Sequence, residues 1–183
     1  MESKQRYFTA LTIAGSDSGG GAGIQADLKT SSALGIFGTS AITAITAQNT
    51  PEVRSVKALS PEIIRTQLQT VLDNFVVDAI KTGMLPSTEI IEVVAQTIDQ
   101  YKLTNLVVEP VAVSTSGTEL ASFNTISACR SLLYARATLI TPTIPEAAKL
   151  SCIEMNSEYD IHRAANILLA DGCLAFFIKG GHR

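Results

Sequence analysis

Short apolar runs alternate with segments of helical spacing along most of the chain. The apolar, β-branched runs predict six buried strands, at 9–14, 40–46, 77–81, 105–109, 137–141 and 174–179. Between them, apolar residues recur every three or four positions and predict helices at 24–34, 61–75, 87–98 and 161–172. Strands that alternate with helices in this way are typical of an α/β fold.

End signals support several of these elements. Ser60 suits an N-cap and Pro61 the first turn of the helix that follows, while Gly35 suits the position just past a helix end. Pro110 and Pro142 stop two of the strands. The pattern therefore predicts one open, mostly parallel α/β sheet with helices on both faces.

Ligands of such a sheet bind at the carboxyl ends of its strands. That edge is formed by the loops at 15–23, 47–51, 82–86, 109–117, 141–146 and 179–183. These loops are also the polar, Gly-rich and Pro-rich stretches of the chain. Topology and composition thus predict the same place for a functional site.

Composition narrows the classes of function. Of 183 residues, 46% are apolar and the net charge is −3, without a basic, aromatic-rich cluster, so nucleic acid is not an expected partner. No apolar run approaches the roughly 20 residues that cross a bilayer, and no membrane association is expected. Three scattered cysteines and two histidines disfavour a disulfide framework, a zinc site and a Ser-His-Asp triad. We expect a cytoplasmic protein.

The first loop, 15–23, contains five glycines between a strand and a helix. Free backbone N–H groups at such a helix start favour an anion or the polar head of a ligand. The loop does not match the dinucleotide fingerprint, the Walker A loop or the GxSxG hydrolase turn. A tight strand-to-helix turn without a ligand is the alternative.

Several motifs occur in a characteristic order. LTIAGSDSGGGAGIQADLK at 11–29 is followed by ITAITAQNT at 42–50 and KTGML at 81–85. The later motifs are VEPVAVSTSG at 108–117, ITPTIPE at 140–146 and IKGGH at 178–182. Together they closely resemble the hydroxymethylpyrimidine and phosphomethylpyrimidine kinases of thiamine biosynthesis, in the ribokinase-like superfamily. The resemblance implies a kinase domain at 10–183, preceded by an N-terminal extension at 1–9.

The resemblance implies that the amino-terminal loops hold the pyrimidine. The residues that it assigns to this pocket are Gly15, Asp27, Thr46, Gln48 and Met84. The amide of Gln48 can match the donors and acceptors of an aminopyrimidine edge, and Met84 can form an apolar wall. The alternatives are an exposed amide for Gln48, a core side chain for Met84 and helix-dipole complementation for Asp27.

The later loops are implied to hold ATP and Mg²⁺. Glu109 and Glu146 are assigned to the metal, and Lys179 to the nucleotide phosphates. Carboxylate oxygens suit magnesium, which neutralises charge during phosphoryl transfer. The alternatives are a helix N-terminal acid for Glu146 and a strand-end charge for Lys179.

The chain departs from the family pattern in four respects. The family's catalytic Gly-Thr-Gly-Cys loop is absent from the sequence, so we assign no catalytic residue and expect a domain incomplete at its C-terminus. Glu109 stands where the family usually has Asp, Ala112 where it has Met, and Thr143 where it has Asn. These differences favour relaxed constraint on the nucleotide half of the site.

Three functions remain open. The first is phosphorylation by ATP of 4-amino-5-hydroxymethyl-2-methylpyrimidine and its monophosphate. The second is a truncated, non-catalytic homologue that binds pyrimidine or a partner subunit, and the third is a pyridoxal or pyridoxine kinase. The resemblance also implies a possible homodimer.

Overall fold

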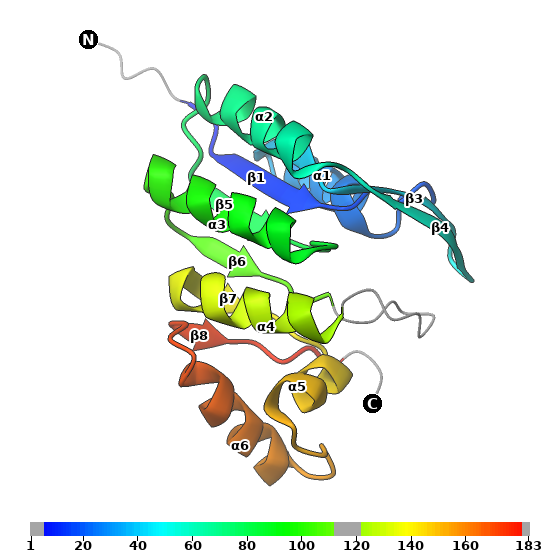
Figure 1. Ribbon diagram of the computed structural model, residues 1–183, viewed down its shortest axis with the longest axis vertical. Helices are drawn as coiled ribbons and strands as arrows, with labels where there is room; N and C mark the ends of the chain where they lie inside the picture. The colour runs from blue at the N-terminus through cyan, green and yellow to red at the C-terminus, as the bar shows by residue number, and fades with distance from the viewer. Residues whose placement is uncertain (1–5, 112–121, 181–183) are drawn as a thin grey trace.

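The computed structural model describes residues 6–111 and 122–180, and its centre is a six-stranded parallel sheet (Figure 1). The strand order is β2-β1-β5-β6-β7-β8, and every neighbouring pair is parallel. The strands are β1 (Thr9–Ala14), β2 (Phe37–Ile42), β5 (Ala79–Thr82), β6 (Leu106–Val108), β7 (Ala137–Ile140) and β8 (Ala175–Phe176).

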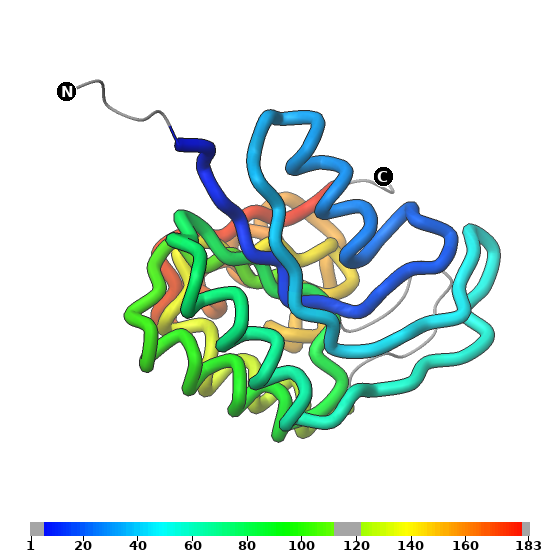
Figure 2. Tube along the Cα trace, turned by 90° about the horizontal axis from the view of Figure 1, so that it is seen from above, coloured from blue at the N-terminus to red at the C-terminus, as the bar shows by residue number. Residues whose placement is uncertain are grey.

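Helices cover both faces of this sheet, as the sequence predicts. α2 (Pro61–Leu72), α3 (Thr88–Tyr101) and α4 (Phe123–Leu132) lie side by side on one face, and α1 (Gly23–Ala33) lies on the other (Figure 2). α5 (Ile144–Ser151) and α6 (Glu158–Leu169) pack on each other beside β8, and a 3₁₀ turn, Tyr134–Arg136, precedes β7. Within the described ranges, no helix has the length and apolar character that a membrane crossing requires.

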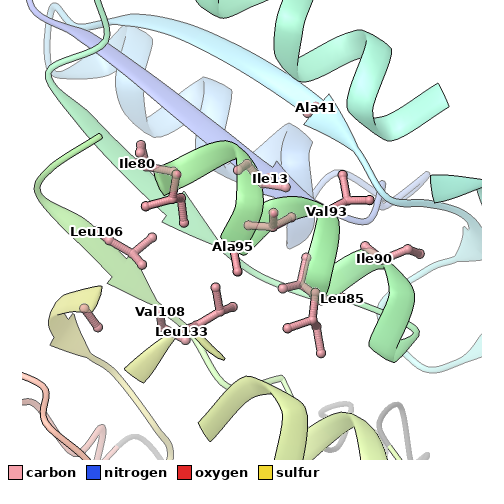
Figure 3. Close-up of a cluster of buried hydrophobic side chains, with 14 of the residues drawn as sticks. Ile13, Ala41, Ile80, Leu85, Ile90, Val93, Ala95, Leu106, Val108 and Leu133 are labelled. Carbon is pink, nitrogen blue, oxygen red and sulfur yellow. The ribbon is translucent and has the colours of Figure 1, made fainter. Parts of the chain in front are cut away.

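The main core lies between one face of the sheet and the helices α2, α3 and α4 that cover it (Figure 3). Ile13, Ile80 and Leu106 contribute from three adjacent strands, and Ile90 and Val94 from α3. All five are almost fully buried. Truncating one such side chain to alanine typically lowers the free energy of unfolding by about 2–5 kcal/mol. This layer therefore holds the strands, and the loops at their ends, in fixed positions.

The end signals predicted at Ser60, Pro61 and Gly35 are confirmed, but the helices predicted at 61–75 and 161–172 end at Leu72 and Leu169, and the helix predicted at 87–98 extends to Tyr101. The hydroxyls of Ser60 and Ser87 accept hydrogen bonds from the N–H groups at the starts of α2 and α3. Pro61 occupies the first turn of α2, and Gly35 has a left-handed φ of 70° just past the end of α1. Local sequence therefore determines where these helices begin and end.

The predicted strand at 40–46 is wrong, because the chain changes direction within it. β2 ends at Ile42 and β3 (Ala44–Gln48) begins a separate antiparallel hairpin with β4 (Val53–Ala58). Thr43 forms the break: its buried hydroxyl donates to the Met84 carbonyl at 2.6 Å. A β-branched run favours strand on both sides of such a break and does not mark it.

The other differences are at the carboxyl-terminal half. The predicted strand at 174–179 is short: β8 has two residues, and Lys179 forms only an isolated bridge with Thr143. Helices α4 and α5 and the strand β4 were not predicted from the pattern. α5 begins inside the predicted loop 141–146, where Thr143 and Glu146 form a capping box.

Candidate functional site

A cavity of about 230 Å³ opens at the carboxyl ends of β1, β5 and β6, as expected for a parallel sheet. The β3–β4 hairpin, which projects beyond the carboxyl end of β1 in Figure 1, forms one of its walls. Seven of the eight predicted site residues line this single cavity: Gly15, Thr46, Gln48, Met84, Glu109, Glu146 and Lys179. The eighth, Asp27, binds a residue of the lining and is not itself part of it.

The first loop differs from the expectation of free backbone N–H groups. The buried carboxylate of Asp17 accepts hydrogen bonds from the N–H groups of Gly19, Gly21 and Ala22, at 2.8–2.9 Å. The N–H of Ile24 donates to the Gly15 carbonyl. These groups are therefore satisfied within the protein, and the loop is a rigid wall of the cavity with an anion of its own.

The same loop is joined to the hairpin by two serines. The Ser16 hydroxyl accepts a hydrogen bond from the Thr46 N–H, and the Thr46 hydroxyl donates to the Ser16 carbonyl. Ser18 accepts from the Gln48 N–H at 2.8 Å and donates to the Gln48 carbonyl at 2.6 Å. These contacts fix the backbone of the strand that carries Thr46 and Gln48.

Gln48 and Met84 both line the cavity. The hydrogen bonds that Gln48 makes with other described residues use its backbone, so its side-chain amide is available to a ligand. Met84 packs against Gly15 so closely that a Cβ on Gly15 would lie 2.5 Å from the Met84 Cε. Glycine is therefore required there if Met84 is to keep its place in the wall.

Four charged side chains of alternating sign form a row beside this wall. The Nζ atom of Lys81, from β5, lies 3.0 Å from Asp27 of α1 and 2.8 Å from the Oε2 atom of Glu109. The Oε1 atom of Glu109 lies 2.6 Å from the Nζ atom of Lys179. The hydroxyl of Thr12 also donates to Asp27. The row links the side of the cavity near α1 to the side near β8.

Burial and charge act against each other in this row. Burial by itself lowers the pKa of Lys81, but the nearby charges of Glu109 and Asp27 outweigh it and hold this pKa above its usual value. Burial likewise raises the pKa of Glu109, and the charges and hydrogen bonds of Lys81 and Lys179 reverse the effect and lower it. Lys81 and Glu109 therefore both stay ionised near neutral pH.

The two predicted metal ligands have different surroundings. Glu146 is buried, and its Oε2 atom accepts from the N–H and hydroxyl of Thr143 at 2.8 and 2.9 Å. Glu109 is engaged by two lysines. Among residues 6–111 and 122–180 no three His, Cys, Asp or Glu side chains gather to hold a metal by themselves. Glu109 and Glu146 are the type of ligand that Mg²⁺ takes where phosphate and water supply the rest of its coordination.

Sequence reasoning missed Lys81 and Asp17. Both stand inside the quoted motifs, and Lys81 lies near the carboxyl end of a strand, which was the available signal. It also missed Val53 and Val56 of the hairpin, which line the cavity. Ala112 and the predicted loop beyond 111 lie outside the described residues, as do 181–183.

A family model described as phosphomethylpyrimidine kinase matches residues 17–183. The chain belongs to this family. It is 46% identical over 176 residues to the hydroxymethylpyrimidine/phosphomethylpyrimidine kinase of Bacillus subtilis, and 45% identical over 178 residues to that of Escherichia coli. These alignments cover 96% and 97% of this chain, and 65% and 67% of the relatives.

Within the family the chain spans about two thirds of the length of these two curated relatives. A bifunctional thiamine biosynthetic enzyme of Arabidopsis thaliana is 48% identical over 181 residues, and the alignment covers 98% of this chain and 35% of that enzyme. This chain is thus similar to one part of a longer protein.

Solved structures of kinases share the fold. A phosphomethylpyrimidine kinase from Clostridium difficile matches with a TM-score of 0.88 at 43% identity, covering 96% of this chain and 76% of that one. A pyridoxal kinase from Staphylococcus aureus in complex with pyridoxal matches with a TM-score of 0.87 at 36% identity, covering 97% of this chain and 64% of that one. The ribokinase-like fold inferred from the motifs is therefore confirmed.

Proposed function

We propose that this chain binds 4-amino-5-hydroxymethyl-2-methylpyrimidine and its monophosphate for phosphorylation by ATP in thiamine biosynthesis. The observation that carries the proposal is the shared cavity. It joins an amide and an apolar wall, Gln48 and Met84, to a charged end that includes Glu109, Glu146 and Lys179. A kinase needs these two chemistries within one enclosed space.

At the first end the protein orients the pyrimidine. The Gln48 amide supplies a donor and an acceptor side by side, and Met84 packs against the ring face. Gly15 leaves the space that Met84 occupies, and Thr46 fixes the hairpin strand through Ser16. Phosphorylation of a pyrimidine held in this way requires its hydroxymethyl group to face the charged end.

At the second end Lys179 attracts the phosphates of ATP, while Glu109 and Glu146 supply oxygens for Mg²⁺. When bound, the ion neutralises charge on the transferred phosphoryl group. The row of alternating charges keeps the Glu109 carboxylate ionised and oriented without substrate. No catalytic residue is assigned, because the sequence contains no Gly-Thr-Gly motif.

The experiment is ATP-dependent phosphorylation of hydroxymethylpyrimidine by the purified chain, with calorimetry of pyrimidine binding alongside. We expect binding that Gln48→Ala weakens at least about tenfold, the loss of one or two good hydrogen bonds. The exposed Gln96→Ala on α3 is the matched control. Turnover above a blank without enzyme supports the kinase, and binding without turnover supports the non-catalytic homologue. Absence of both contradicts the proposal.

Two finer points need their own measurements. Pyridoxal kinases share the fold at lower identity than the pyrimidine kinases named above, which favours the pyrimidine. Side-by-side titration with hydroxymethylpyrimidine and pyridoxal decides between them. The possible homodimer stays a prediction, which sedimentation equilibrium measures.

A further inference from the structure

Each oxygen of the Glu109 carboxylate is bound by a different lysine, and the two lysines differ in how many other partners they have. The Oε2 atom lies 2.8 Å from the Nζ atom of Lys81, and the Oε1 atom lies 2.6 Å from the Nζ atom of Lys179. Each ammonium occupies the position that a cation bound to that oxygen would take. A divalent ion at Glu109 must therefore displace one of the two lysines or lie beside them against their repulsion.

Lys81 is the lysine that stays. It extends from β5 in the interior of the sheet, between β1 and β6, and its ammonium contacts carboxylates on two sides. Asp27 offers both oxygens, at 3.0 and 3.1 Å, and is itself held by Thr12. If Lys81 moved away from Glu109, both part-buried charges would lose an ion-pair partner, which is unfavourable.

Lys179 is the lysine that can leave. Its ammonium contacts Glu109 and no other carboxylate of the described residues, and it follows β8 at the edge of the sheet. Its backbone is fixed, because its N–H donates to the Pro142 carbonyl at 2.7 Å. Only the flexible side chain has to rotate for Oε1 to be released.

We propose that Lys179 is a placeholder for the divalent cation at the Oε1 atom of Glu109, and that a phosphate group of the nucleotide draws it away. This proposal rests on the proposed function for the identity of the ligands. Phosphate offers the ammonium a second anion, and Oε1 is then open to a metal ion carried by the same phosphates. Cation and nucleotide each favour the binding of the other.

The direct test is titration of the nucleotide-free protein with Mn²⁺. The electron paramagnetic resonance signal of the free ion measures how much Mn²⁺ remains unbound. Removing the placeholder in Lys179→Met should strengthen Mn²⁺ binding at least about tenfold, because one contact-distance charge repulsion is lost. Lys179→Arg, which keeps the charge, should bind Mn²⁺ as the unsubstituted chain does. Lys57→Met, an exposed lysine of β4 outside the cavity lining, is the matched control.

A double variant locates the effect. Lys179→Met combined with Glu109→Gln should lose the gain, because the released oxygen no longer carries charge. Unchanged or weaker Mn²⁺ binding by Lys179→Met overturns the proposal, and so does a gain that survives the Glu109 substitution. Thermal unfolding of each variant shows whether it is folded.

A second measurement uses the unsubstituted chain. Calorimetry with ADP should give at least about tenfold tighter binding in Mg²⁺ than in a chelator, as reciprocal coupling requires. Equal ADP affinity in the two conditions overturns the proposal. Neither measurement uses the pyrimidine, so failure to phosphorylate hydroxymethylpyrimidine and failure of the placeholder are separate results.

Discussion

The ammonium of Lys81 lies 3.0 Å from the carboxylate of Asp27, 54 positions earlier in the chain. This contact turns Asp27 toward β5, and Lys81 is the member of the pair that lines the cavity. Asp27 was predicted to bind the pyrimidine directly. The contact with Lys81 offers a different role, in which Asp27 positions Lys81 and does not touch the ligand.

Asp27→Asn should lower the free energy of unfolding by about 1–3 kcal/mol, because part-buried Lys81 keeps only one carboxylate partner. Urea denaturation measures this change. Calorimetry should show a smaller loss of pyrimidine affinity than Gln48→Ala causes. A loss as large as that of Gln48→Ala would return Asp27 to direct contact with the ligand.

The Asp17 carboxylate is expected to be a structural anion of the first loop. Asp17→Ala leaves three backbone N–H groups without their acceptor and should cost about 2–4 kcal/mol of unfolding free energy. Asp17→Asn, which keeps one acceptor oxygen, should cost less. Urea denaturation is the measurement, with Glu62→Gln at the exposed start of α2 as the control. Equal stability of Asp17→Ala and the unsubstituted chain would contradict this role.

Gly15→Ala should act on the pocket more than on the fold. The added methyl group would lie 2.5 Å from the Met84 Cε atom, so Met84 has to move within the wall of the proposed pyrimidine pocket. We expect at least about tenfold weaker binding of hydroxymethylpyrimidine, with less than about 1 kcal/mol change in stability. Gly21→Ala in the same loop is the control, since its new Cβ would meet only the Asp17 Oδ2 atom at 3.9 Å. Similar affinities for the two variants would count against the close contact.

Acid should remove the stabilising effect of Glu109. Its pKa in the folded protein lies below the usual value, so its contribution is present above the unfolded pKa and is lost as the pH falls through the folded pKa. Unfolding free energies of the unsubstituted chain and Glu109→Gln should therefore converge as the pH falls from neutral to below the usual glutamate pKa of about 4.3. Urea titrations at several pH values measure the difference. A difference that is constant across this range would show that the charge of Glu109 does not matter to stability.

Much of the fold was accessible from local sequence. Apolar runs and caps such as Ser60 and Ser87 report on their own neighbours, so element order and sheet class follow from them. The hairpin was not accessible, because the break at Thr43 depends on a hydrogen bond to the distant Met84 carbonyl. Helix α4 was missed because the residues that it buries, Thr125 and Ala128, are small and do not form a stripe of large apolar side chains.

The sequence by itself determined which loops meet at one edge of the sheet. Seven of the eight residues that its motifs assign to the site line one cavity at that edge. This follows because parallel strands bring their carboxyl ends together whatever their side chains. Only the tertiary structure decided how the charged groups pair. The register of β1 and β5 sets Lys81 beside Thr12, whose hydroxyl binds Asp27 of α1. Glu109 follows β6, the other neighbour of β5, and Lys179 reaches it from beyond β8. An ion pair depends on the distance between two side chains in space, and spacing along the chain does not report that distance.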